Sequence, residues 1–160
     1  MMAMLRPPYE TLEGQGARTV RQVSVFLDNR PGQLLRLTRL FAKQDIRILA
    51  LSVVDSADHA VVRLLFDSAD EAVAILRQAG FAVSVAELVV VRLPHGKRGL
   101  LTVWSALLTS EINIAYAYPL LPTEVGPAIA LHVDNVEIAI DTLEEKGFEV
   151  LGEADLESGG

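Results

Sequence analysis

Apolar and polar positions follow one another in the same order twice along this chain of 160 residues. Two runs rich in β-branched residues, 20–27 and 88–93, each break at a turn that contains Pro and Gly, as strands do. In both halves apolar residues then recur at helical spacing, over 34–41 and over 101–108. Each half therefore begins with a strand, a turn and an amphipathic helix.

Two further strands and a second helix complete each half. The strands are predicted at 47–54 and 60–66 in the first half, and at 113–119 and 128–133 in the second. The second helix begins with acidic residues and ends at Gly80 or Gly147, the residue type that closes helices in the left-handed conformation. A last strand then returns to the sheet, so the predicted order in each half is βαββαβ.

The two halves are copies of one another. A shift of about 67 positions superimposes them. The matched pairs are Gly32 with Gly99, Leu34 with Leu101, Leu40 with Leu107, Asp67 with Asp134, Ala72 with Ala139, Leu76 with Leu143, Gly80 with Gly147, Phe81 with Phe148, and Val83 with Val150.

This order predicts an α+β fold of two ferredoxin-like βαββαβ modules, each an antiparallel four-stranded sheet with both helices on one face. We expect a loose N-terminal tail over 1–19, a first module over 20–87 and a second over 88–157. No Gly-, Pro- or Ser-rich linker separates the modules, so we expect them to be held rigidly, side by side.

Composition narrows the functional classes. The net charge is −7 and the basic residues are scattered, which argues against nucleic acid as a ligand. The chain has no cysteine, and its apolar runs are shorter than the roughly 20 residues that span a bilayer. We therefore expect a cytoplasmic protein with no disulfide, no membrane association and no cofactor or metal.

The most informative segment is the turn between the first strand and the first helix. It reads Asp28, Asn29, Arg30, Pro31, Gly32, Gln33, Leu34. Pro31 suits the first helical turn, and the free N–H groups near Gly32 form an anion site suited to a carboxylate. Asp28 and the Asn29 amide can receive an ammonium group. A purely structural interpretation stays open, in which Asn29 caps the helix and Pro-Gly makes the turn.

The strand, the Asn-Arg-Pro-Gly turn, the amphipathic helix and Asp45-Ile46-x-Ile48 together resemble the start of an ACT domain. The resemblance covers about residues 20 to 156 and is closest to small stand-alone proteins made of two ACT modules. It implies a regulatory protein that binds an amino acid at this turn. Arg47 stands where the family pattern has Asn, and Leu27 where some serine-binding members have His, which argues against serine as the ligand.

The second copy departs from the first at the same turn. It reads Pro94-His95-Gly96-Lys97-Arg98-Gly99, and its next strand begins Ile112-Asn113-Ile114-Ala115-Tyr116. The resemblance adds Arg47, Ile48, Gly99, Asn113, Ile114 and Tyr116 to the candidate ligand-binding residues. Lys97 and Arg98 are candidates as a basic pair that can clamp an anion, and the alternative is that they are simply solvated. Either the modules contribute complementary halves of one site, a helix start facing Arg47 or Asn113, or one of two sites has diverged and lost its function. Tyr116 and Tyr118 alternate on a strand and can share a face.

Two other functional classes remain. Residues 128–150 also resemble a fragment of the glyoxalase and dioxygenase superfamily, with His132 on a strand, but the three histidines do not assemble a metal site of two His and one carboxylate. A ligand-free interaction platform is the other class, because sheet edges need covering. We expect no catalysis, a homodimer, and a separate protein as any enzyme that is regulated.

Overall fold

The computed structural model describes residues 18–28 and 30–157, and Asn29 lies outside them. The elements of the first module are β1 (Val20–Asp28), α2 (Gln33–Ala42), β2 (Ile48–Asp55), β3 (His59–Phe66), α3 (Ala69–Gln78) and the beginning of β4 (Ala82–Arg92). The second module continues from β4 with α4 (Gly99–Thr109), β5 (Ile114–Pro119), β6 (Ala128–Val133), α5 (Val136–Glu145), β7 (Val150–Leu151) and α6 (Glu153–Glu157). The predicted α+β class and the doubled βαββαβ order are confirmed.

One long strand, β4, belongs to both modules. Residues 82–88 pair antiparallel with β1, and residues 89–92 pair antiparallel with β6. The result is one seven-stranded sheet in the order β2-β3-β1-β4-β6-β5, in which β7 also pairs with β4. The expected module boundary between residues 87 and 88 falls inside β4, and the exact bounds of the two modules stay a prediction.

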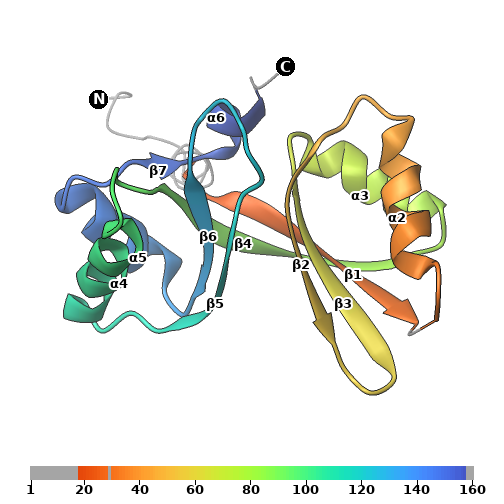
Figure 1. Cartoon of the computed structure of the whole chain (residues 1–160), viewed down its shortest axis with the longest axis horizontal. Coiled ribbons are helices and arrows are strands. Elements are labelled where there is room, and N and C mark those ends of the chain that lie inside the picture. The colour runs from red at the N-terminus through yellow and green to blue at the C-terminus, as the bar shows by residue number, and fades with distance from the viewer. Residues whose placement is uncertain (1–17, 29, 158–160) are drawn as a thin grey trace, which may run out of the picture.

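The helices cover one face of each half of the sheet, as predicted. In the first module Leu37 and Phe41 of α2 and Leu76 of α3 pack against Val23 and Val25 of β1. Equivalent residues of α4 and α5 pack against Val89 and Val91 of β4 in the second module. Figure 1 shows the consequence: the helix pairs lie at opposite ends of the molecule, with the strands between them.

The other faces of the two half-sheets pack against each other. This third apolar cluster joins Leu49 and Leu65 of the first module to Tyr118, Ala130 and other residues of the second. The sheet edges also meet, because the Leu121 N–H donates to the Leu49 carbonyl at 2.8 Å. Leu49 of β2 is buried on this second face, whereas Leu51 and Val53 are exposed and lie on the helix-covered face, because they pair with Leu64 and Val62 of the first core.

Three local features differ from the predictions or were missed by them. Pro31 does not lie in the first helical turn, because Gly32 adopts a left-handed φ of 87° and α2 begins only at Gln33. The last strand of the second module has only two residues, and the short helix α6 follows it. The left-handed glycines after the second helices were predicted correctly, with φ of 89° at Gly80 and 87° at Gly147. Among the described residues, no helix has the length and apolar character needed to cross a membrane.

Candidate ligand sites at the two strand–helix turns

The described residues of the first turn, 28 and 30–32, are exposed, and Asp28 and Arg30 carry opposite charges. Arg30 donates from Nη2 to Asp28 Oδ2 at 3.2 Å, and both side chains are well exposed. Arg36 is the first residue bonded into the helix, through its N–H to the Gly32 carbonyl at 2.9 Å, so the N–H groups before it have no partner within the helix. A carboxylate can therefore approach this helix start, but an ammonium group must compete with Arg30 for Asp28.

Gly32 is required at the first turn for backbone reasons. A Cβ atom added there would meet nothing within 4 Å, so space is not limiting. The left-handed φ of 87° disfavours any side chain except Asn or Asp. Asn29 lies outside the described residues, so the structure says nothing of its amide or of its predicted cap. Gln33 is half-buried and Leu34 exposed.

The second turn encloses a pocket of about 310 Å³ at the start of α4. Its walls come from the turn, from the helix start and from the loop before β6; the lining residues are Leu93, Pro94, His95, Gly96, Lys97, Gly99, Leu100 and Pro127. A Cβ atom on Gly99 would lie 2.8 Å from the Pro94 carbonyl oxygen, so only glycine fits at this helix start. The Gly99 N–H is already engaged by the Gly96 carbonyl at 3.4 Å, so the helix start offers the N–H groups that follow Gly99, beside a lysine and a concave wall.

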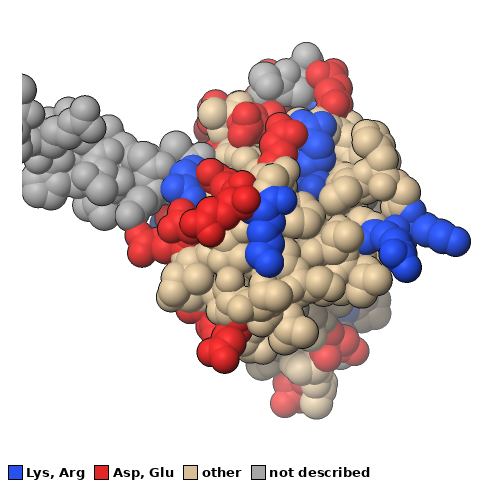
Figure 2. All heavy atoms as spheres, turned by 90° about the vertical axis from the view of Figure 1, so that its left-hand side faces the viewer, with Lys and Arg blue, Asp and Glu red and all other residues tan. Residues whose placement is uncertain are grey.

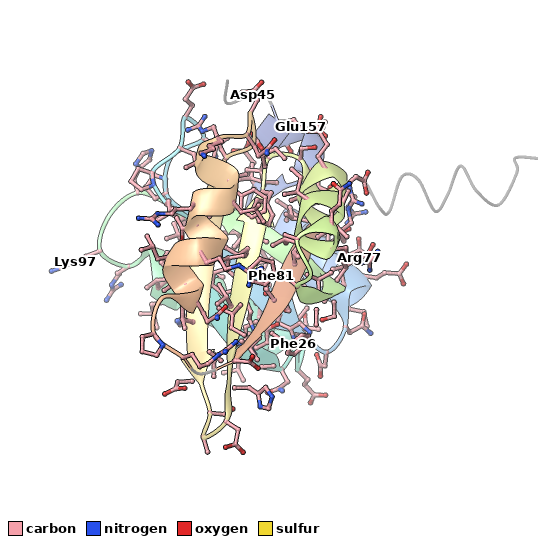
Figure 3. The ribbon with its side chains drawn as sticks, turned by 90° about the vertical axis from the view of Figure 1, so that its right-hand side faces the viewer. Phe26, Asp45, Arg77, Phe81, Lys97 and Glu157 are labelled. Carbon is pink, nitrogen blue, oxygen red and sulfur yellow. The ribbon has the colours of Figure 1, made fainter. Side chains whose placement is uncertain are left out.

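Lys97 and Arg98 lie in different surroundings. Lys97 lines the pocket of the second turn and projects from the body of the molecule (Figure 3). Arg98 instead lines a separate groove of about 350 Å³ between α4 and the end of α5, together with Lys146 and Phe148. Figure 2 views this end of the molecule and shows basic side chains projecting at one edge, apart from the acidic groups.

The two turns lie at opposite ends of the long axis (Figure 1). The reason is the pairing of β1 with β4: antiparallel neighbours run in opposite directions, so the turns that follow them leave the sheet at opposite ends. The buried cluster between the half-sheets contains no residue of either turn. A single site built from both turns of one chain therefore does not match this arrangement.

The candidate residues at the second strand of each module have structural partners. The Arg47 N–H donates to Asp67 Oδ1 at 2.9 Å, and the Asn113 N–H donates to Asp134 Oδ1 at 3.1 Å. Arg47 also lines a cavity of about 30 Å³ with residues of the second module, including Thr123 and Asp155. Ile48 and Ile114, which begin β2 and β5, pack at the edges of the two helix-side cores.

Tyr116 and Tyr118 share one face of β5, as predicted, and contact the first module. Gln22, only 1% exposed, accepts from Tyr118 Oη at 2.7 Å and donates to Tyr116 Oη at 2.8 Å. The Arg63 guanidinium lies 3.7 Å from the Tyr116 ring centroid, and the His132 ring stacks on Tyr116 at 4.7 Å. Burial raises the pKa of Tyr118, so its hydroxyl remains a donor at neutral pH.

Sequence reasoning missed several members of these sites. Pro127 forms a wall of the second pocket although it precedes a strand about 30 residues away, and no local pattern indicates that contact. Gln22 gave no distinct signal, because the polar residues Arg21 and Ser24 lie in the same strand. Among the described residues, no three metal-ligating side chains lie together, and His132 is engaged with Tyr116.

The fold and the turns define a class: a pair of ferredoxin-like modules, each presenting a strand–helix turn. The chain belongs to the family of ACT domain pairs, whose model matches residues 18–158. The predicted family is thereby confirmed. None of the curated proteins searched matches the chain.

Solved structures with the same fold include a protein from Bacteroides thetaiotaomicron, BT0572. It is 27% identical, with a TM-score of 0.81 over 89% of this chain and 99% of that one. The ligand-free regulatory subunit of aspartate kinase from Thermus thermophilus is 15% identical, with a TM-score of 0.56 over 79% of this chain and 91% of that one. The corresponding subunit from Thermus flavus is 14% identical, with a TM-score of 0.52 over 79% and 92%. At such low identity the two kinase subunits show likeness of fold alone.

Proposed function

We propose that this protein is a non-catalytic regulatory protein that binds the carboxylate of an amino acid or a close analogue at its strand–helix turns. The observation that carries the proposal is the pocket of about 310 Å³ at the second turn, where the start of α4 meets Lys97. Helix starts attract anions through free N–H groups and the helix dipole, and a lysine beside them adds a full positive charge.

The second turn is proposed as the stronger anion site, and the first turn as its weaker counterpart. The loop of the second turn contains Lys97, Arg98 and His95 and no acidic residue. In the first turn the negative charge of Asp28 offsets the positive charge of Arg30. Asp28 and Asn29 remain the proposed ammonium receptors of the first turn. Asn113, Ile114 and Tyr116 remain proposed ligand contacts for a ligand that extends to β5.

Regulation requires that ligand favour one of two arrangements, because a ligand shifts an equilibrium only through its difference in affinity between the states. We infer that the regulated protein is a separate, cytoplasmic enzyme, since the family is regulatory and two of the similar structures are described as regulatory subunits of aspartate kinase. We also infer a homodimer.

A thermal-shift screen tests the proposal, with the twenty amino acids, several α-keto acids and common divalent metals as probes. A ligand at 100 times its Kd stabilises the folded state by about 2.7 kcal/mol. Stabilisation by an amino acid or keto acid that Lys97→Ala weakens supports the proposal. Stabilisation by metal alone favours the enzyme class, and no stabilisation by any probe favours a ligand-free platform.

A further inference from the structure

Half of β4 has an edge that no described strand covers. Residues 82–88 pair with β1 on one side only, while β6 and β7 pair with β4 only from Val89 onward. The strand order places β1 and β6 on opposite sides of β4. In the part of the chain that the structure describes, the side of residues 82–88 that faces away from β1 is therefore unpaired.

The hydrogen bonds at the end of β4 show which residues present their backbone groups at this edge. Leu93 donates its N–H to the Pro127 carbonyl on the β6 side, and Arg92 donates its N–H to the Glu149 carbonyl on the β7 side, both at 2.9 Å. Backbone groups alternate sides along a strand, and the β4 ladders contain no register shift. Counting back in steps of two, Val83, Val85 and Glu87 direct their N–H and C=O groups to the free edge.

The other sheet edges carry features that oppose strand addition. β2 has a bulge near Ile48, and its Leu49 carbonyl is occupied by Leu121; β5 has a bulge near Ile114 and ends in Pro119. β7 has only two residues. The unpaired segment 82–88 has no proline or bulge, and Glu87 is its one charged residue, next to the uncharged run Ala82-Val83-Ser84-Val85-Ala86. Natural proteins blunt or cover such edges, so this one needs a cover.

A groove of about 350 Å³ runs beside this edge along α3. Its helical wall has Asp70 at one end, Val73 and Ala74 in the middle and Arg77 at the other end, and the opposite wall is formed by Arg21 of β1 and Val85 of β4. Asp70 is bound through Oδ1 to Arg21 at 2.6 Å. Arg77, on the outer side of α3 in Figure 3, has no ionic partner among the described residues.

We propose that a second copy of this chain covers the edge, with β4 paired antiparallel to β4 about a two-fold axis at Val85. A two-fold axis brings the same patch of both copies together and reverses its direction. Asp70 of one α3 then faces Arg77 of the other, and the small Ala74 residues allow the helices to approach. Val85, the only β4 residue lining the groove, lies opposite the middle of the helical stripe, which fixes the register.

This inference rests on the self-association included in the proposed function, and it does not depend on ligand. Its experiments are done without ligand, so failure here leaves amino-acid binding to be judged by the thermal-shift screen. Conversely, a protein that binds no amino acid can still pair through β4.

Cross-linking tests the axis, because the chain has no natural cysteine. In Val85→Cys the two thiols belong to directly opposed residues, whose Cα atoms are about 5.5 Å apart in a hydrogen-bonded pair, within disulfide range. In the matched control Val83→Cys, residue 83 faces Glu87 of the other copy, and the thiols are offset by roughly 13 Å. Val53→Cys tests whether two copies pair instead through the exposed edge of β2.

We expect mild oxidation to give a covalent dimer of Val85→Cys on a non-reducing gel, with Val83→Cys and Val53→Cys remaining monomeric. Preferential cross-linking of Val53→Cys would move the interface to β2 and overturn the proposal. Efficient cross-linking of Val83→Cys would overturn the register. A wild-type chain that sediments as a monomer up to about 100 µM, a concentration at which specific interfaces of standard size associate, would overturn the dimer itself.

Charge reversal tests the α3 contact by sedimentation velocity. Arg77→Asp places like charges opposite Asp70, and we expect the dimer Kd to rise at least about tenfold. Arg39→Asp, the same exchange at an exposed position of α2, is the matched control and should leave the Kd within about twofold. Equal effects of the two variants, with folding verified by circular dichroism, would contradict the proposed helix pairing.

Discussion

The two strand–helix turns occupy matched positions of the sequence repeat, yet the glycines found there, Gly32 and Gly99, have different roles. Gly32 has open space around it and a left-handed φ, whereas Gly99 begins α4 against the Pro94 carbonyl oxygen. The described residues of the first turn, 28 and 30–32, are exposed and include an ion pair, while the second turn lines a pocket together with Pro127. Two residues at matched positions of a sequence repeat can therefore be required for different physical reasons.

The difference in charge follows the difference in shape. Asp28 and Arg30 neutralise each other at 3.2 Å in the first turn. The second turn gathers Lys97 and His95 around a concave surface with no acidic side chain among its lining residues. An anion therefore gains more from the second turn, through Coulomb attraction, the helix start and partial removal from water.

The largest expected effect separates the two glycines. Gly99→Asn should destabilise the fold by about 1–3 kcal/mol, because its Cβ must displace the Pro94 carbonyl. Gly32→Asn should cost less than about 0.5 kcal/mol, because Asn tolerates left-handed backbone and the site has room. Urea unfolding measures both variants, and equal losses would break the comparison.

The next effect tests the polar contact that joins the two half-sheets between the turns. Tyr118→Phe leaves Gln22 Oε1 buried without its donor, and we expect a loss of about 1–2 kcal/mol in the free energy of unfolding. Tyr116→Phe is the matched control with a smaller loss, because Gln22 Nε2 retains Ser24 Oγ at 3.3 Å. If Tyr118→Phe costs nothing in urea unfolding, this hydrogen bond does not hold the half-sheets together.

Ligand affinity sharpens the comparison of charge. Lys97→Ala should weaken binding of an amino acid found in the thermal-shift screen about tenfold, a change of about 1.4 kcal/mol, since a charge-assisted contact is lost. Arg30→Ala should change the affinity less than about twofold, because Arg30 is occupied by Asp28. Isothermal titration calorimetry gives both values, and the reverse order would assign the main site to the first turn.

The smallest effect concerns the ion pair itself. Arg30→Gln removes an exposed pair and should change the free energy of unfolding by less than about 1 kcal/mol, measured by urea unfolding. The same variant frees Asp28 to receive an ammonium group. A larger loss of stability would mean that the first turn is held by its charges and not by Gly32.

The sequence predicted the fold because local patterns and the duplication agreed at every element up to α5, and only the short β7 and α6 at the end of the chain departed from them. The acidic start of α5 and its Asn135 cap, which accepts from the Ile138 N–H at 3.1 Å, are local features that can be read from spacing. The sharing of β4 could also be anticipated, since residues 82–93 contain no linker. These features depend on neighbours in the sequence.

The candidate sites were less predictable because their walls come from distant segments. Pro127 closes the second pocket, and Gln22 meets Tyr118 across 96 positions of sequence. Strand direction places the two turns at opposite ends of the sheet, which spacing alone does not reveal, and a site that joins a helix start to Arg47 or Asn113 of the other module stays a prediction. Lys97 and Arg98 are adjacent in sequence but line different hollows.

The most direct test of amino-acid binding at the second turn is an NMR titration of ¹⁵N-labelled protein with the twenty amino acids. The account predicts that the largest amide shifts fall on Gly99 and Leu100, with smaller ones on Gln33 and Leu34. Shifts concentrated on Gln22 and Tyr116 between the half-sheets, or no shift with any amino acid at millimolar concentration, would contradict it.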